Sequence, residues 1–332
     1  MRISLLLLAL AATACSSGDT SGTDTDTDTD TDVLAGATDM RKDFPDAPWA
    51  DPIIFQSGVY RVPAGSEKQY CYYTTWTGDD TAIHREVTYQ SKFGHHFIIA
   101  GTTTTAREIP DGTTVDCTAA DAPGMDNFVP LLIGGVIGNG NTPGLLELPA
   151  GVATEITKGQ RLVFQSHYLN TSADDIVVQD ELQLEAMPYD SVVDWAAPFV
   201  DTVSEFSIPT GIHSLEVKCT WDEDSNLLFV GGHMHEWGKS YSIDWQHADG
   251  SDTEQIYNIP VWDPYMRDAP VYTDYTAEPL KVKAGDTFST KCEWNNDTGE
   301  AFGFPKEMCA TFGMMLGRKV PFICDDGNAT PF

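Results

Sequence analysis

Five histidines and one methionine are the residues of this chain best suited to carry out chemistry. They lie in four short segments that resemble strands and strand ends. The six residues are His95, His96, His167, His233, His235 and Met308. Imidazole together with a soft thioether selects copper, particularly Cu(I), over zinc or calcium. We therefore predict two metal sites, one with three imidazoles and one with two imidazoles and a thioether.

The pair His233 and His235 has the spacing that a strand requires of two ligands. Side chains two residues apart project from the same face of a strand, so both imidazoles can reach one ion. The Gly231-Gly232 pair just before them allows close approach of backbone or ligand. A His-x-His pattern is only moderately specific by itself, because many exposed pairs of this kind bind no metal.

The other ligand candidates are less well placed by simple strand geometry. His95 and His96 are adjacent, and neighbours in a strand point to opposite faces. They can share one ion only through a bulge or bend, which Gly94 would permit. A single histidine such as His167 is equally typical of a hydrogen-bonded core position, and most methionines, Met308 included, could be core filling.

The elements that must position these residues are strands. Short apolar or alternating runs are separated by Gly, Pro, Asn and Asp, and no long amphipathic helix pattern occurs. Such a chain is predicted to be all-β, with two tandem antiparallel, jelly-roll-like β-sandwich domains and one copper site in each. The clearest expected strands are Glu155–Ile156, Arg161–Leu169, Asn226–Val230, Tyr241–Trp245, Thr287–Trp294 and Ala310–Leu316.

A weak internal repeat supports two similar domains. The run Gly159-Gln160-Arg161-Leu162 leads into a strand that ends at Asn170, and Gly285-Asp286-Thr287-Phe288 leads into one that ends at Asn296. Chance recurrence of a turn followed by a strand explains the match equally well. We expect an N-terminal copper domain at residues 45–195 and a C-terminal copper domain at 196–332.

The N-terminus is typical of an exported protein. Arg2 and the apolar run Leu5–Ala12 predict a signal peptide at residues 1–14. Cys15 follows small residues, as in a bacterial lipoprotein, so we expect a lipid-anchored protein of the cell envelope or surface. The alternative is simple secretion with Cys15 discarded. Residues 15–44, with their Thr-Asp repeat, are expected to be a disordered tether.

The net charge of −31 limits the choice of partners. Six aspartates between Ser16 and Asp32 account for part of it, and from Val33 onward there are 18 Lys+Arg and 44 Asp+Glu. Such a surface repels nucleic acid and anionic membranes. We therefore expect no nucleic-acid partner.

Six further cysteines complete the candidate residues. An even number in an exported protein predicts disulfides, although spacing alone does not choose among the pairings. They are Cys71, Cys117, Cys219, Cys292, Cys309 and Cys324.

Taken together, the order and spacing of these motifs resemble the copper type II, ascorbate-dependent monooxygenases, which hydroxylate peptidylglycine or dopamine. The resemblance extends over residues 71 to 324. The matching segments are His95-His96, Gln165-Ser166-His167-Tyr168, His233-Met234-His235 with Gly238-Lys239 after it, and Glu307-Met308-Cys309.

The resemblance implies a mechanism with two copper ions per chain. His95, His96 and His167 would hold an electron-storing copper. His233, His235 and Met308 would be the catalytic residues and hold the copper that meets O2 and substrate. Ascorbate or another one-electron donor would reduce both ions, and an sp3 C–H bond would be hydroxylated. The resemblance also implies the pairs Cys71–Cys117, Cys219–Cys324 and Cys292–Cys309.

The substrate positions depart from the family pattern. Peptide-amidating members hold a substrate carboxylate with Arg, Asn and Tyr at positions that are Gly231, Ala310 and Phe312 here. We therefore expect a neutral or apolar substrate, in a pocket lined by Phe312, Trp237 and Met234. Two alternatives are a non-catalytic copper-binding surface lipoprotein and a purely structural β-sandwich.

Overall fold

The computed structural model describes residues 35–41, 47–117, 127–129, 144–267, 269–304, 306–325 and 327–331. The predicted signal peptide, Cys15 and most of the predicted tether lie outside these ranges. Within them, none of the helices has the length and apolar character needed to cross a membrane.

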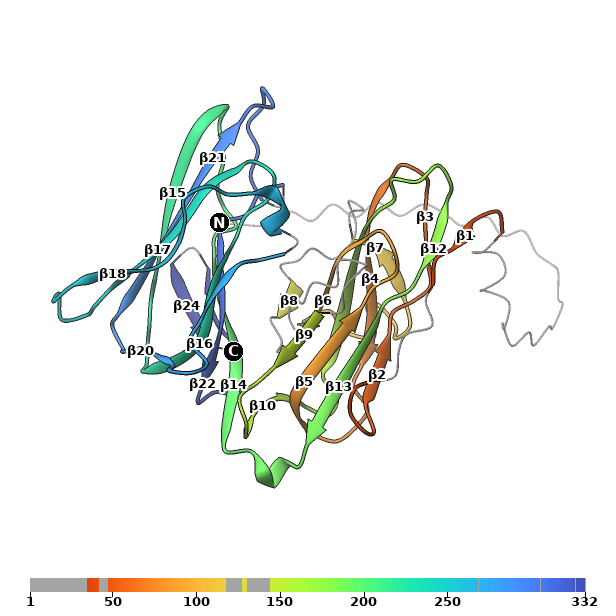
Figure 1. Cartoon of the computed structure of the whole chain (residues 1–332), viewed down its shortest axis with the longest axis horizontal. Helices are drawn as coiled ribbons and strands as arrows, with labels where there is room; N and C mark the ends of the chain where they lie inside the picture. Colours follow the sequence, from red (N-terminus) through yellow and green to blue (C-terminus); the bar gives the residue numbers. More distant parts are fainter. Residues whose placement is uncertain are drawn as a thin grey trace, which may run out of the picture.

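The first part of the chain folds into a β-sandwich, which we call the first sandwich. One layer is the five-stranded sheet β7-β4-β11-β6-β8, and the other contains β10, β5, β13 and β2, with β9 beside β5 (Figure 1). A small sheet, β1-β12-β3, lies next to them. The bounds are β1 Thr38–Asp39, β2 Ile53–Gln56, β3 Tyr60–Val62, β4 Glu67–Thr75, β5 Thr81–Tyr89, β6 Gly94–Thr102, β7 Thr114–Asp116, β8 Phe128–Val129, β9 Gly144–Glu147, β10 Val152–Ile156, β11 Arg161–Leu169, β12 Ile176–Val178 and β13 Glu181–Met187.

The rest of the chain forms a second sandwich. The sheet β15-β21-β17-β18 packs on a layer that contains β19, β16, β22 and β14, with β20, β23 and β24 at its margins. Two 3-10 helices, η2 Tyr189–Ser191 and η3 Pro264–Arg267, interrupt the strands. The bounds are β14 Asp194–Thr202, β15 Gly211–Thr220, β16 Ser225–His233, β17 Gly238–Gln246, β18 Thr253–Ile259, β19 Tyr272–Asp274, β20 Leu280–Val282, β21 Thr287–Asn296, β22 Ala310–Leu316, β23 Phe322–Asp325 and β24 Asn328–Pro331.

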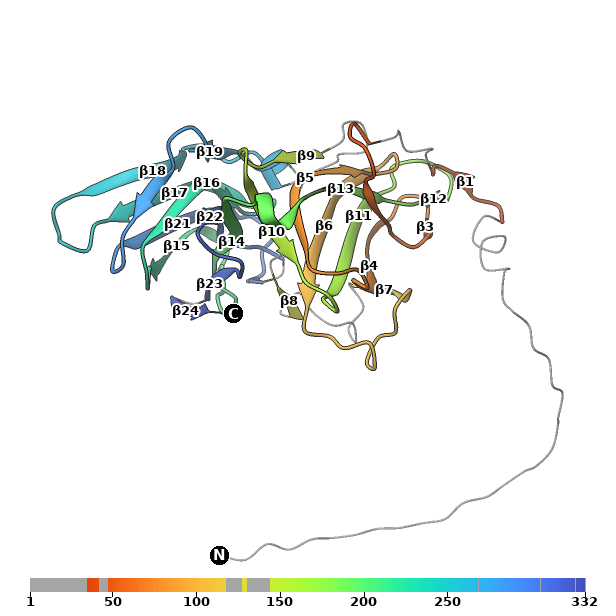
Figure 2. The same ribbon diagram turned by 90° about the horizontal axis from the view of Figure 1, so that it is seen from below.

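The two sandwiches share one sheet. Strand β10 of the first pairs with β14 of the second through Val152 with Asp194 and Ala153 with Trp195, and Figure 2 shows β10 between β14 and β5. An apolar cluster that includes Val152, Leu228 and Met314 packs at this junction. The expected domain boundary at 195/196 falls inside β14, and the division into two domains stays a prediction.

Each sandwich has its own core. In the first, eight buried residues from β5, β6, β10, β11 and β13 meet between the layers, with Phe164 at the centre. In the second, Trp221, Trp294 and Phe288 are among the largest buried side chains. Because both layers of each sandwich contribute apolar side chains, the all-β sandwich architecture predicted from the alternating pattern is confirmed.

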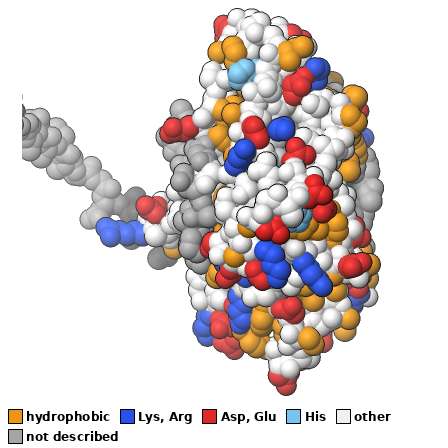
Figure 3. Space-filling view, turned by 90° about the vertical axis from the view of Figure 1, so that its left-hand side faces the viewer, with side chains coloured by type: hydrophobic (Ala, Val, Ile, Leu, Met, Phe, Trp, Pro, Cys, Tyr) orange, Lys and Arg blue, Asp and Glu red, His pale blue; other side chains and the backbone are white. Residues whose placement is uncertain are grey.

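On the side of the second sandwich turned to the viewer in Figure 3, acidic and basic side chains are interspersed. The acidic side chains therefore do not form one continuous acidic patch on that side.

Buried asparagines shape the matching turns that follow β11 and β21. Asn170 donates to the backbone of Val62, Pro63 and Asp174, and its oxygen accepts from Ser172. Asn296 donates to Ile208 and Glu300, and its oxygen accepts from Thr298 in the same way.

These asparagines occupy corresponding positions of the repeat expected from sequence, so the repeat extends to the side-chain hydrogen bonding of the turn. Asn170 is 0% exposed and Asn296 is 1% exposed. In both N-x-S/T sequences the asparagine and the Ser or Thr side chain therefore stabilise the turn through hydrogen bonds.

The predicted tether, residues 15–44, is wrong at its C-terminal end. Strand β1 within it pairs in parallel with β12, where the Thr38 amide donates to Asp175 and the Met40 amide to Val177. Arg41 pairs with Asp39, and the Met40 side chain packs on a small apolar cluster beneath. The acidic composition of the tether concealed these few residues, which satisfy an otherwise open strand edge.

Three disulfides connect the six described cysteines. They join Cys71 to Cys117, Cys219 to Cys324 and Cys292 to Cys309. These are the pairs that the family resemblance implies, and the predicted presence of disulfides is confirmed. Disulfides are typical of proteins that leave the reducing cytosol.

Candidate metal centres

A bulge brings the three histidines of the first cluster together. We call His95, His96 and His167 the first cluster. In the β6–β11 pair, His167 lies opposite His96 but Tyr168 lies opposite Gly94, so His95 is the extra residue of a β-bulge. A bulge redirects the side chains beside it. The irregularity that adjacent histidines require is therefore present at this point.

The residue before the bulge also departs from ordinary strand geometry. Phe93 has a φ of 72°, in the left-handed region that favours glycine. Strained backbone of this kind is concentrated at functional sites. The unusual φ belongs to Phe93, whereas the sequence directed attention to Gly94.

One pair of histidines in the first cluster has the spacing of two ligands on a shared ion. The His96 and His167 Nδ1 atoms lie 3.4 Å apart, and the His95 and His167 ring centroids 5.1 Å apart. Two nitrogens each about 2.0–2.1 Å from one ion, at a tetrahedral angle, are separated by about 3.3 Å. The His96–His167 pair fits that spacing, and His95 stands at its edge.

A carboxylate orients one imidazole of the first cluster. The buried His167 places its Nε2 2.6 Å from Oε1 of Glu67, across the β11–β4 pair. An Nε2–H that donates to this carboxylate fixes the tautomer in which Nδ1 carries the lone pair. Metal-ligating histidines commonly donate their second N–H to a carboxylate or carbonyl in this way.

The second cluster forms where β16 ends and β22 begins. We define it as His233, His235 and Met308. His233 pairs with Ala310 in the register of the two strands, and continuing that register places His235 opposite Met308. The disulfide from Cys309 to Cys292 ties the methionine segment to β21. Strand pairing and disulfide thus hold the thioether segment beside the two imidazoles.

Both imidazoles of the second cluster present Nε2. The His233 and His235 Nε2 atoms lie 3.2 Å apart, close to the spacing of two ligands on one ion. His235 Nδ1 lies 3.2 Å from the Lys306 carbonyl oxygen, to which it can donate a proton while Nε2 keeps a lone pair. The pKa of His235 is lowered, chiefly by burial. A low pKa favours the neutral imidazole that a metal needs.

Glu307 holds the backbone of the second cluster in place through hydrogen bonds. Its buried carboxylate accepts four N–H groups: the amides of His235, Trp237 and Met308, at 2.9, 2.7 and 3.2 Å, and the Trp294 indole at 3.0 Å. Burial raises the pKa of Glu307, and these donors oppose the rise. One carboxylate thus connects the backbones of His235 and Met308, two of the candidate ligands.

Arg267 links the two clusters across the junction of the sandwiches. Arg267, in η3 of the second sandwich, donates from Nη2 to His95 Nδ1 of the first, at 2.8 Å. Its Nη1 also pairs with Glu236, the residue after His235. All six predicted ligands therefore lie around one region, and their donor types fit copper.

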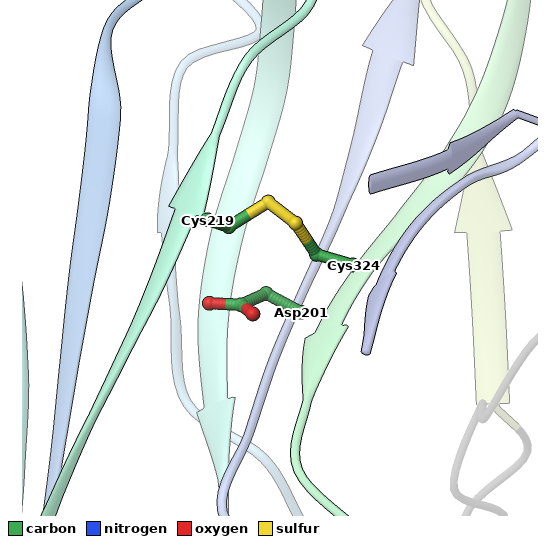
Figure 4. Close-up of side chains that lie close together, drawn as sticks. All are labelled: Asp201, Cys219 and Cys324. Carbon is green, nitrogen blue, oxygen red and sulfur yellow. A yellow bond between two sulfur atoms is a disulfide. The ribbon is translucent and has the colours of Figure 1, made fainter. Parts of the chain in front are cut away.

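A different group of side chains brings three ligand atoms near one another but cannot hold a metal. Asp201, Cys219 and Cys324 place three such atoms within 4.8 Å of one another. Both sulfurs belong to one disulfide, as Figure 4 shows, so no thiolate is available. We interpret this group as structural.

The surroundings of Gly231 leave little room for a side chain. Gly231 pairs with Phe312 on one side and Tyr272 on the other. A Cβ atom at Gly231 would lie 2.5 Å from Phe312 Cζ and 3.0 Å from the Val271 carbonyl oxygen. An arginine therefore does not fit here without moving its neighbours.

An aromatic strip runs beside the second cluster. We give this name to Phe229, Phe312 and Tyr272. Phe229 and His233 flank Gly231 at two-residue spacing, so they share its face of the sheet. The Phe229 and Tyr272 rings are 5.4 Å apart, and Tyr272 is 56% exposed. The strip is an apolar surface that leads to the second cluster.

The expectation that Met234 lines the substrate pocket is wrong. Met234 is 0% exposed and belongs to the core of the second sandwich. It lies between His233 and His235, and alternate residues of an extended segment point to opposite sides. Trp237 is half-buried and packs on Phe302, with Lys306 over its ring.

Sequence reasoning did not identify three residues that shape the clusters. Glu67 lies on another strand, and only the register of β4 and β11 brings it to His167. Arg267 reaches His95 from the other sandwich. Glu307 did carry a signal, its position directly before Met308, but no role followed from that position alone.

Comparison with known proteins does not assign a family. No family model and no curated protein matches the sequence. Among solved structures, the major capsid protein P2 of bacteriophage PM2 aligns at 6% identity over 80% of this chain and 97% of that chain, with a TM-score of 0.33. A triple-jelly-roll protein of an archaeal virus (7% identity, 81% and 61%, TM-score 0.21) and VP2 of infectious bursal disease virus (9%, 86% and 75%, TM-score 0.22) are similar at this level. Likenesses this distant carry no argument about function.

Proposed function

We propose that this protein is a dicopper monooxygenase that hydroxylates an sp3 C–H bond of a small, neutral or apolar substrate. The observation that carries the proposal is the pairing of two soft-ligand clusters around one junction. Each cluster has two imidazole nitrogens at the spacing of ligands on one ion, 3.4 Å and 3.2 Å. Each also has a carboxylate behind it, Glu67 or Glu307.

The two clusters would have different roles, one in electron storage and one in the reaction with O2 and substrate. When bound, copper supplies one-electron storage and activation of O2, with electrons from ascorbate or another one-electron donor, so that one oxygen atom enters the substrate and the other leaves as water. His95, His96 and His167 would hold the electron-storing ion. His233, His235 and Met308 would hold the ion nearest the substrate, and Glu307 keeps their backbone in place.

The aromatic strip supports an apolar substrate. Phe312 occupies the space that an anchoring arginine at Gly231 would need, so no cation is offered there to a substrate carboxylate. Contact with Phe229, Phe312 and Tyr272 would instead bind a hydrophobic group and place its C–H bond beside His233. Burying one aromatic ring contributes about 1.5–3 kcal/mol.

The proposed location is outside the cytosol. The three disulfides favour an oxidising compartment. We further propose that residues 1–14 are removed and that Cys15 carries a lipid anchor. Growth with a labelled fatty acid would label the wild-type protein and leave a Cys15→Ser variant unlabelled.

The test of function is copper reconstitution followed by an ascorbate-driven screen of small molecules. The expected result is ascorbate-dependent O2 consumption with a matching yield of hydroxylated product. Met308→Ala should lose most of this coupled turnover, because the thioether of the second cluster is gone, yet still bind copper at the first cluster.

Three outcomes would contradict the proposal in different ways. Two bound copper ions without turnover on any substrate would favour a copper-binding surface protein. Less than about one copper per chain would favour a purely structural sandwich. Full activity in Met308→Ala would show that the methionine is not a ligand at the reacting centre.

The strip gives a separate prediction about specificity. Phe312→Ala should lower kcat/KM for an apolar substrate about tenfold, because an aromatic contact of roughly 1.4 kcal/mol or more is lost. Copper binding should stay unchanged, and Phe312→Tyr should behave nearly as wild type. Equal kcat/KM values in Phe312→Ala and wild type would place the substrate elsewhere.

A further inference from the structure

Arg267 connects the two sandwiches at the candidate metal centres. Its side chain, 13% exposed, forms an ion pair with Glu236, the residue after His235. Its Nη2 also donates to Nδ1 of His95, 172 positions away in the sequence, at 2.8 Å. The short helix η3 carries this arginine into the junction, and the Asp263 carboxylate accepts the Tyr265 amide at its start.

The bond to His95 has a chemical consequence. A guanidinium only donates hydrogen bonds, so His95 Nδ1 must accept and cannot carry a proton. In the neutral imidazole the proton is then on Nε2. Neither nitrogen of His95 therefore offers a lone pair to a metal while Arg267 stays bound to it.

Coordination through either nitrogen of the neutral ring breaks this contact. If Nδ1 binds the metal, its lone pair is no longer available to Arg267. If Nε2 binds the metal, the proton moves to Nδ1, where it meets the N–H of Arg267. Both routes end the hydrogen bond between the arginine and His95.

We propose that Arg267 and copper compete for His95, so that Arg267 is a strap between the sandwiches which loading of the first cluster releases. This inference rests on the proposed copper chemistry of the first cluster. Arg267 acts here as a positioning residue that holds His95 by its Nδ1 until a metal arrives.

Release at the first cluster would reach the second. Trp262 lies five residues before Arg267, and its indole N–H donates to the His235 carbonyl at 3.0 Å. Glu236, the ion-pair partner of the arginine, directly follows His235. Because coupling between two binding events is reciprocal, copper at the second cluster should in turn change copper affinity at the first.

The experiment measures Cu(II) affinity of the first cluster in the metal-free full-length chain. A His233→Ala background disables the second cluster, and a competing chelator sets the free copper concentration. Arg267→Gln should bind copper about tenfold more tightly than the Arg267 parent. In that variant copper does not have to break a charge-assisted hydrogen bond. Such a bond contributes about 1.5 kcal/mol, which corresponds to about tenfold in affinity.

A matched control separates the two contacts of the arginine. Glu236→Gln removes the ion pair but leaves the bond to His95, so it should change copper affinity by less than about threefold. Thermal unfolding gives a second readout. Arg267→Gln should lower the Tm of the metal-free protein, and saturating copper should remove that difference.

The outcomes are distinguishable. Equal or weaker copper binding in Arg267→Gln would overturn the strap and make Arg267 a support of the site. Failure of the first cluster to bind Cu(II) even in the Arg267 parent would overturn the copper function itself. Tighter binding in both Arg267→Gln and Glu236→Gln would assign the effect to local charge, and would also overturn the strap.

Discussion

Glu307→Ala is expected to remove copper from the second cluster and leave the first cluster loaded. The carboxylate accepts the amides of His235, Trp237 and Met308 and the Trp294 indole, and alanine leaves these donors without their acceptor. Loss of a residue that orients metal ligands typically costs 10–100-fold in affinity. We expect a loss of about 100-fold in affinity, and a decrease of about 3–5 kcal/mol in the free energy of unfolding.

Two further variants make this prediction selective. Glu307→Gln should have a milder effect, because the amide oxygen can still accept from most of the donors. Glu67→Gln is the reciprocal control, since Glu67 contacts His167, and it should weaken only the first cluster. Copper titration and denaturant unfolding measure both effects. Equal loss at both clusters in Glu307→Ala would mean general unfolding and contradict the role given to Glu307.

Asp201→Asn is expected to stabilise the protein at alkaline pH and change little at acidic pH. Burial raises the pKa of Asp201 to about 7 from its ordinary 3.8. The carboxyl accepts from Thr290, and its Oδ1 has no hydrogen-bond partner. Because the folded state favours the protonated form, Asp201 contributes stability that is complete below about pH 3.8 and is lost as pH rises through about 7.

The expected difference follows from the size of that shift. One pKa unit corresponds to 1.36 kcal/mol, so the asparagine variant should gain roughly 2–4 kcal/mol at pH 8. Denaturant unfolding from pH 4 to pH 9 measures it. Asp180→Asn is a matched comparison, because burial raises the pKa of Asp180 to about 6 and its effect should be complete at a lower pH. A pH-independent difference between wild type and Asp201→Asn would contradict a buried ionisable Asp201.

The strands could be predicted where turn residues bracket a clear apolar run. Arg161–Leu169 and Ala310–Leu316 have in the structure the bounds expected from sequence. Glycines at the turns mark where each strand begins or ends, and the apolar or alternating pattern between them indicates a strand. Strand β1 was missed because two paired residues within an acidic, Thr-rich stretch give no periodic signal.

The candidate ligands could be proposed from sequence, but the residues that contact them could not. His233 and His235 have a local spacing that fixes their common face, and the bulge at His95 was required once both histidines were assigned to one ion. Glu67 and Arg267 reach the clusters only through strand register and the packing of the two sandwiches. Those contacts join residues far apart in the chain, so no local pattern encodes them.

The matched asparagine turns align the two halves of the chain, but this alignment does not bring the two candidate clusters into equivalent positions. Asn170 and Asn296 occupy equivalent positions in a repeated frame, and that equivalence sets His167 against Glu293. Glu293 pairs with Lys239 where the first sandwich places an imidazole. If the repeat records a duplication, each half acquired its ligands separately after it. Chains that keep one cluster and lack the other are then an expected intermediate in the history of this architecture.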